Sequence, residues 1–83
     1  MNRIFAREGE IIRLSRMVKG LSQHQVANIL GVHIRQYQRL EYGERSVGKV
    51  NMELGLSLCR VLEIDPFLLV LGSSMDTPNK EKP

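Results

Sequence analysis

The sequence is poor in the residues that build disulfides, metal sites and covalent catalysis. It has one cysteine, Cys59, and two histidines, His24 and His33, among 83 residues. One cysteine cannot form an internal disulfide, and neither histidine has a cysteine or carboxylate at metal-ligand spacing. We therefore expect no metal, no cofactor and no enzymatic activity. Cys59 lies in an apolar helical pattern, which favours a buried, reduced thiol over a redox sensor or an intermolecular bridge.

Long apolar runs and the pattern of a secretory leader are also missing. No segment approaches the roughly 18 apolar residues that indicate a membrane-spanning helix. We therefore expect a cytoplasmic protein without a membrane partner. A length of 83 residues leaves room for one domain, so no separate domain for a small-molecule ligand is expected.

What the chain does have is a modest and clustered positive charge. Twelve Lys and Arg against nine Asp and Glu give a net charge of +3 and a pI near 9.4. This balance permits binding to a polyanion but does not establish it. The clustering is more informative, because residues 33–49 contain Arg35, Arg39, Arg45 and Lys49.

The apolar residues recur at helical spacing throughout, with no run of strand-type alternation. The pattern predicts an all-α domain of five short helices around one core, at about residues 9–19, 23–30, 34–42, 52–62 and 66–71. In the first helix, Ile11, Leu14 and Val18 form the expected inward stripe, flanked by Ile12. Residues 1–8 are read as an N-terminal lead, residues 9–72 as the domain and the polar residues 73–83 as a disordered tail.

The segment from 22 to 43 has the features of a helix-turn-helix. Ser22 and Gln25 have the spacing of a capping box, and Gly31 stands where the chain must turn. The inward residues of the two helices are expected to be Val26, Leu30, Tyr37 and Leu40, and the small Ala27 lets the helix axes approach. In such a motif the second helix can enter the major groove of DNA.

The stretch GLSQHQVANILGVHIRQYQRLEYGERS, residues 20–46, resembles the Cro and lambda-repressor type of helix-turn-helix, the XRE family. The joint pattern of LSQ, Ala27, Gly31-Val32, Leu40-Glu41 and Gly43 carries the resemblance, which extends to VLEIDPFLL. It implies a lambda-repressor-like DNA-binding domain in a sequence-specific transcriptional regulator, a repressor or autoregulator. The alternative is an antitoxin or antirepressor that acts mainly by binding another protein, although residues 73–83 are short and polar for that role.

The resemblance also implies roles for three residues. Arg16 and Glu41 would form a structural salt bridge between the first and third helices, and Gln23 would hold a DNA phosphate. Gln23 could instead be a plain residue of a first helical turn. The physics of helix N-termini and amide side chains agrees with phosphate binding.

The outward face of the third helix supplies the candidate base contacts. Excluding the inward residues leaves Ile34, Arg35, Gln38 and Arg39. Arginine reads guanine O6 and N7 in a bidentate manner, and Ile34 could contact a thymine methyl group. The alternative is that both arginines belong to an ordinary solvated face. The candidates for phosphate contacts, besides Gln23, are His33, Gln36, Arg45, Ser46 and Lys49.

The sequence departs from the family pattern in three places. His33 stands where Ser or Thr usually caps the third helix, and Tyr37 replaces an aliphatic core residue. The connection from Gly43 to Asn51 is about three residues longer than usual and lacks the usual proline. These departures leave the phosphate contacts of residues 45–49 open.

The fifth helix contains the run FLLVL, residues 67–71, which is too apolar for one buried face. Exposed apolar clusters commonly mark partner surfaces. We therefore expect a homodimer formed through Phe67, Leu68, Val70 and Leu71. A twofold dimer requires a palindromic operator on double-stranded DNA, with half-sites about 34–36 Å apart.

Overall fold

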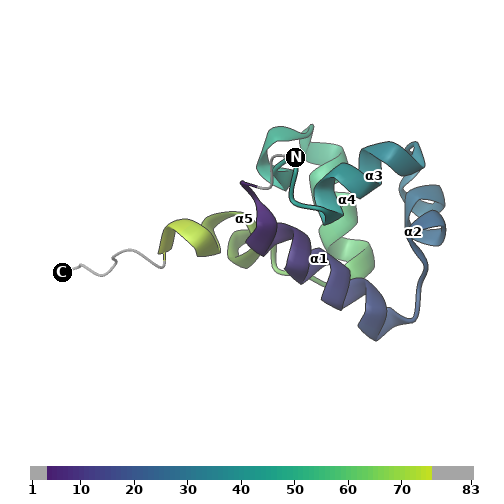
Figure 1. Cartoon of the computed structure of the whole chain (residues 1–83), viewed down its shortest axis with the longest axis horizontal. Coiled ribbons are helices and arrows are strands. Elements are labelled where there is room, and N and C mark those ends of the chain that lie inside the picture. Colours follow the sequence, from purple (N-terminus) through teal and green to yellow (C-terminus); the bar gives the residue numbers. More distant parts are fainter. Residues whose placement is uncertain (1–3, 76–83) are drawn as a thin grey trace.

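A computed structural model describes the backbone of residues 4–75 and the side chains of residues 4–70. It contains α1 (Ala6–Lys19), α2 (Gln23–Leu30), α3 (Ile34–Glu41), the short 3-10 helix η1 (Val47–Lys49), α4 (Met52–Leu62) and α5 (Pro66–Met75) (Figure 1). No strand occurs in the described residues. The all-α class with five α-helices is thus confirmed.

The helix bounds differ from the expected ones mainly at the two ends of the domain. Helix α1 begins at Ala6, inside the segment read as a lead, and α5 continues to Met75, beyond residue 72. The 3-10 helix η1 was not expected at all. Residues 1–3 of the lead and 76–83 of the tail lie outside the described residues.

All five α-helices contribute to one core. Helix α1 packs against α3, α4 and α5, and α2 packs against α3 and α4 (Figure 1). The most deeply buried side chains are Ile12, Val26, Tyr37, Leu40, Leu58 and Leu69. Because α3 has its apolar side chains in this core, its opposite face is left for solvent or a ligand.

Local hydrogen bonds fix the start and end of α2. The Gln25 amide donates to Ser22 Oγ over 3.1 Å, and the Ser22 amide donates to Gln25 Oε1 over 2.8 Å. Gly31 ends the helix with a φ of 73°, a conformation that an L side chain adopts only with strain. The chain therefore turns sharply between α2 and α3, as the sequence predicted.

The expected inward stripe of α1 was wrong for two of its three residues, because only Ile11 is partly buried and packs against the core. Leu14 and Val18 are 47% and 87% exposed, whereas Ile12 is fully buried. The buried face of α1 instead follows Glu8, Gly9 and Ile12. Polar partners and a close backbone contact select this face, so the count of apolar residues points to the wrong side.

Two glycines allow the start of α1 to lie directly on the end of α3. A Cβ atom on Gly9 would lie 2.3 Å from the Glu41 carbonyl oxygen, and one on Gly43 would lie 2.8 Å from the Ala6 Cα atom. Gly55 in α4 is different, because its nearest neighbour would be a Val47 methyl carbon at an ordinary 3.5 Å. The close backbone approach that requires a glycine is therefore found in α1 and not in α4.

These distances predict opposite effects for two alanine substitutions. Gly9→Ala should lower the free energy of unfolding by about 1–3 kcal/mol or more, because backbone atoms have to shift. Gly55→Ala should raise it by up to about 1 kcal/mol, because alanine is the better helix former and has room. Urea denaturation of both variants tests this, and equal effects would contradict the crossing geometry.

Candidate nucleic-acid interface

A buried ion pair connects α1 to the end of α3. Arg16 Nε donates to Glu41 Oε1 over 2.8 Å, and Nη2 donates to Oε2 over 2.9 Å. This is the bidentate geometry in which a guanidinium group binds a carboxylate most strongly. Arg16 Nη1 also donates to the Leu21 carbonyl oxygen over 2.9 Å, which ties the segment before α2 to the same point.

Two more side chains donate to the same carboxylate. The Tyr37 hydroxyl donates to Glu41 Oε1 over 2.6 Å, and Gln23 Nε2 donates to Oε2 over 2.8 Å. The buried tyrosine that replaces an aliphatic residue thus has its partner four residues along the same helix. The Glu41 carboxylate joins α1, α2 and α3 through charged and neutral donors.

The Glu41 carboxylate also determines how the side-chain amides of Gln23 and Gln38 are oriented. An ionised carboxylate only accepts hydrogen bonds, so the amino end of Gln23 must face Glu41. The carbonyl oxygen of Gln23 then accepts from Gln38 Nε2 over 3.0 Å. Consequently Gln38 has its amino group toward Gln23, and its orientation on α3 is set from inside the protein.

The surroundings of Arg16 and Glu41 keep both side chains ionised. Burial alone would raise the pKa of Glu41, but the hydrogen bonds from Arg16, Tyr37 and Gln23 outweigh it and lower the pKa. The hydrogen bond to Glu41 raises the pKa of Arg16, against the smaller effect of burial. Burial and the hydrogen bond to Glu41 raise the pKa of Tyr37 well above its usual value. The hydroxyl therefore stays a donor throughout the physiological range.

The opposite face of α3 is basic and open. An open hollow of about 440 Å³, here called the basic hollow, lies between α3 and the connection to α4. It is lined by His33, Arg35, Gln36, Arg39, Arg45, Lys49, Val50 and Asn51. Val50 and Asn51, which follow η1, were not among the candidate DNA contacts. No acidic side chain is among these lining residues, so the hollow attracts anions.

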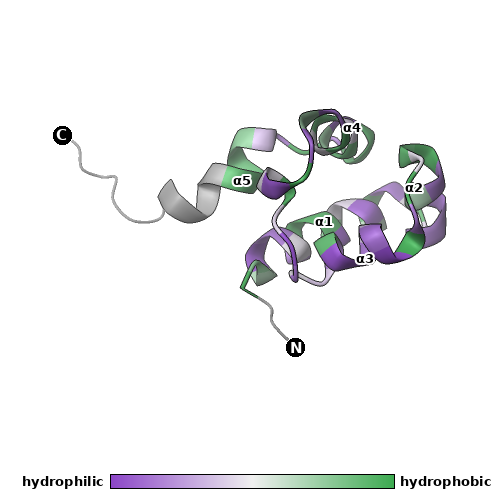
Figure 2. Ribbon diagram, turned by 90° about the horizontal axis from the view of Figure 1, so that it is seen from above, coloured by the Kyte–Doolittle hydropathy of each residue, from purple (hydrophilic) through white to green (hydrophobic). Residues whose placement is uncertain are grey.

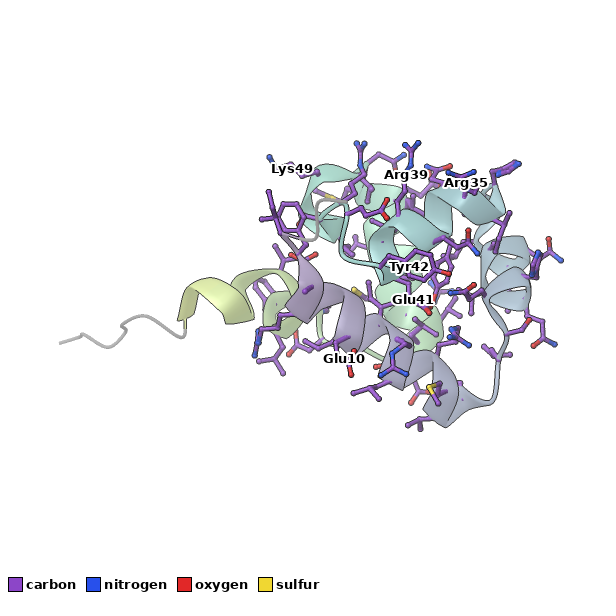
Figure 3. The ribbon with its side chains drawn as sticks, viewed as in Figure 1. Glu10, Arg35, Arg39, Glu41, Tyr42 and Lys49 are labelled. Atoms are coloured by element: carbon purple, nitrogen blue, oxygen red, sulfur yellow. The ribbon has the colours of Figure 1, made fainter. Side chains whose placement is uncertain are left out.

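Figure 3 shows that Arg35, Arg39 and Lys49 lie along one edge of the molecule and point away from its body. Both arginines are exposed, and within the described residues neither guanidinium group has a hydrogen-bond or ion-pair partner. The ribbon of α3 is correspondingly hydrophilic over most of its length (Figure 2). Unpaired guanidinium groups on a helix face are available to a ligand.

The other candidate base contacts lie partly in the domain. Ile34 is half-buried and packs against the core. Gln38 is half-buried and lines a second hollow beside Arg35 and Arg39. Both side chains therefore combine a packing role with an exposed edge on α3.

Three of the candidate phosphate contacts have partners inside the protein. His33 Nδ1 accepts from the Arg35 amide over 3.1 Å, so His33 caps α3. The Gln23 amino group contacts Glu41 and, over 3.3 Å, the Tyr42 hydroxyl. Ser46 is only 5% exposed, and its hydroxyl donates to Glu8. Ser46 is therefore not positioned to touch a phosphate, whereas Gln36, Arg45 and Lys49 are exposed.

Glu8 was not among the residues selected from the sequence. It fell within the expected lead, yet the residue is only 5% exposed and its carboxylate contacts a segment far along the chain. A glutamate one turn before the buried Ile12 is the only signal that could have drawn attention to it.

The candidate dimer residues are divided between exposed and half-buried positions. Phe67 and Leu68 are 69% and 62% exposed on α5. Val70 is half-buried and lines an apolar groove of about 320 Å³ together with residues of η1 and α4. The side chain of Leu71 lies outside the described residues. Figure 2 shows α5 as hydrophobic where it is coloured.

The described part of the chain has neither a metal-binding cluster nor a membrane-crossing helix. It contains no group of three or more His, Cys, Asp or Glu side chains placed to hold a metal ion. Among residues 4–75 there is also no helix with the length and apolar character that crossing a bilayer requires. Cys59 is buried, and burial raises the pKa of its thiol.

Comparison with known proteins adds one match. A family model described as helix-turn-helix matches residues 12–69, which is more than half of the chain. No curated protein and no solved structure matches the chain. The matched region includes the later part of α1, all of α2, the turn, α3 and α4, and the beginning of α5.

The lowered pKa of Glu41 predicts how stability changes with acidity. A carboxylate whose pKa falls on folding stabilises the protein above its unfolded pKa, and this contribution is lost as the pH drops through the folded pKa. Glu41→Gln should cost up to about 3 kcal/mol of unfolding free energy at neutral pH, because Arg16 loses its partner. The difference should shrink as the pH falls below the ordinary value of 4.5. Urea denaturation across this range measures it, and two parallel curves would refute the assignment.

Proposed function

The chain belongs to the XRE-type helix-turn-helix family of DNA-binding regulators, and from this premise we propose that it is a sequence-specific repressor or autoregulator. In this proposal α3 enters the major groove of double-stranded DNA, and the regulator acts in the cytoplasm. The basic hollow is the main support for this proposal. Four cationic side chains line it, two from the outward face of α3 and two from the connection to α4. The buried Glu41 network supports it by holding α3 against α1 and α2.

Arg35 and Arg39 are the proposed guanine readers. They lie one helical turn apart, so both can reach base edges in the same groove. Ile34 precedes them and is proposed to contact a thymine methyl group. Gln38 is proposed as a further base contact, with the amide orientation that Gln23 gives it.

The proposed phosphate contacts flank these residues. Gln36, Arg45 and Lys49 line the basic hollow with exposed side chains. His33 uses Nδ1 to cap α3, which leaves its other ring nitrogen as the proposed phosphate contact. Gln23 has one exposed and longer bond, to Tyr42, and a phosphate oxygen could replace that acceptor. Its other hydrogen stays on Glu41.

We further propose that the regulator is a homodimer that uses α5. The exposed Phe67 and Leu68 support this, since two large apolar side chains next to each other are costly to leave in water. A twofold dimer would bind a palindromic operator whose half-sites are about one turn of DNA apart. Isologous contact would use Phe67 and Leu68 of both copies.

The guanine contacts can be tested after the operator has been selected from a random DNA pool. Arg35→Ala and Arg39→Ala should each cost about 1–3 kcal/mol of discrimination and should relax the preference at different base pairs. Arg60→Ala, an exposed arginine on α4, is the matched control and should leave the preference intact. Unchanged operator affinity in the double variant Arg35→Ala/Arg39→Ala would exclude the proposed reading.

The dimer is tested by placing charge on α5. Phe67→Glu combined with Leu68→Glu should shift the protein to monomer in analytical ultracentrifugation and weaken binding to a palindrome more than to a single half-site. Val18→Glu on α1 replaces an apolar residue that is even more exposed and should leave the dimer intact. A dimer that persists in the α5 variant, or that only Val18→Glu dissociates, would place the interface elsewhere.

A further inference from the structure

A buried carboxylate contacts the segment that carries Arg45 and Lys49 of the basic hollow. Glu8, in the first turn of α1, is 5% exposed. Its oxygens accept from Ser46 Oγ over 2.9 and 3.1 Å, and Oε1 accepts from the Val47 amide over 2.9 Å. These bonds join α1 to the connection between α3 and α4, 38 and 39 residues further along the chain.

The carboxylate determines how η1 begins. Because an ionised carboxylate only accepts, the single hydrogen of the Ser46 hydroxyl is directed to Glu8. The hydroxyl oxygen is then free to accept from the Gly48 amide, which it does over 3.0 Å. Two amide groups of η1 thus receive acceptors, one from Glu8 itself and one from a hydroxyl that Glu8 orients. Without Glu8, the Val47 amide would lose its acceptor, and the Ser46 hydroxyl that caps η1 would lose the partner that orients it.

The two cations at the far side of the hollow belong to this short segment. Arg45 directly precedes Ser46, and Lys49 is the last residue of η1. Arg45 Nη2 also donates to the Lys49 carbonyl oxygen, over 3.4 Å. The position of both side chains relative to α3 therefore depends on how the segment is held, and its bonds to Glu8 hold it from inside.

A second attachment of α1 fixes the other end of the segment. The Phe5 amide donates to the Gly43 carbonyl oxygen over 2.9 Å, and Gly9 lies against the Glu41 carbonyl. The beginning of α1 thus contacts the chain from Glu41 to Val47. These contacts matter because residues 43–51 contain no proline that would stiffen the connection.

We propose that Glu8 is a positioning residue for DNA binding, which holds Arg45 and Lys49 at a fixed distance from Arg35 and Arg39. The inference rests on the proposed function. Pre-placed cations meet the phosphates without the entropy loss of ordering a mobile segment on binding. In this proposal Glu8 does not touch DNA. It strengthens the contacts of Arg45 and Lys49 with the DNA phosphates and does not change which bases α3 reads.

The test compares Glu8→Ala in two backgrounds, with the operator selected from a random DNA pool as the probe. In the otherwise unchanged chain, the substitution should lower affinity for all sequences alike and preserve their order. The slope of log affinity against log salt should become shallower by about 1 to 2, since each lost phosphate contact contributes about 0.9. In a chain that already carries Arg45→Ala and Lys49→Ala, Glu8→Ala should change neither affinity nor slope.

Two controls make the outcomes decisive. Glu10→Ala removes an exposed glutamate that pairs with Arg13 on the edge of α1 away from the basic hollow (Figure 3) and should leave binding unchanged. Ser46→Ala is the milder variant if Glu8→Ala lowers the folded fraction, and it should reproduce the shallower slope.

The failures of the two proposals are distinguishable. An equal loss of affinity in both backgrounds, or a loss with an unchanged salt slope, would show that Glu8 only stabilises the fold. Absence of salt-dependent binding by the unmodified chain would instead overturn the proposed function itself.

Discussion

The Glu41 carboxylate is the point on which the arrangement of the first three helices depends. It lies at the end of α3 and receives hydrogen bonds from Arg16 of α1, Gln23 of α2 and Tyr37 of α3. A buried charge that lost these donors would be strongly destabilising. Each donor is therefore held in one geometry. The helix proposed to read DNA is fixed at its C-terminal end by electrostatics, and apolar packing fixes the rest of it.

The two sides of α3 show how one short helix can separate stability from recognition. Tyr37, Leu40 and Glu41 are buried, whereas Arg35 and Arg39 have no partner among the described side chains. Gln38 connects the two sides, because its amide is oriented by Gln23 and its edge remains accessible. The buried face of α3 is held in place, so it restricts the positions that the side chains of the exposed face can take. A change in an outward arginine can alter the ligand with little effect on the core.

Local signals in the sequence were sufficient for much of the fold. The capping box at Ser22, the glycine at 31 and the asparagine cap before α4 depend on neighbouring residues, and the structure has all three. The helix-turn-helix and the outward arginines followed because Tyr37 and Leu40 mark the inward face. Periodicity failed on α1, where a close contact at Gly9 and polar partners choose the buried side. It also could not reveal that Ser46 is covered, since the partner of Ser46 is 38 residues away.

The bonds from the beginning of α1 to the segment 41–47 also set the order in which this chain can fold. During synthesis α1 emerges before α2 and α3, while the residues that bond to it come some 25 to 39 positions later. At about 5–20 residues per second, the ribosome leaves that face open for on the order of seconds. Helices α2 and α3, by contrast, are adjacent in sequence and can pair as soon as both are made. The nascent chain should therefore form its helix-turn-helix before α1 closes onto it.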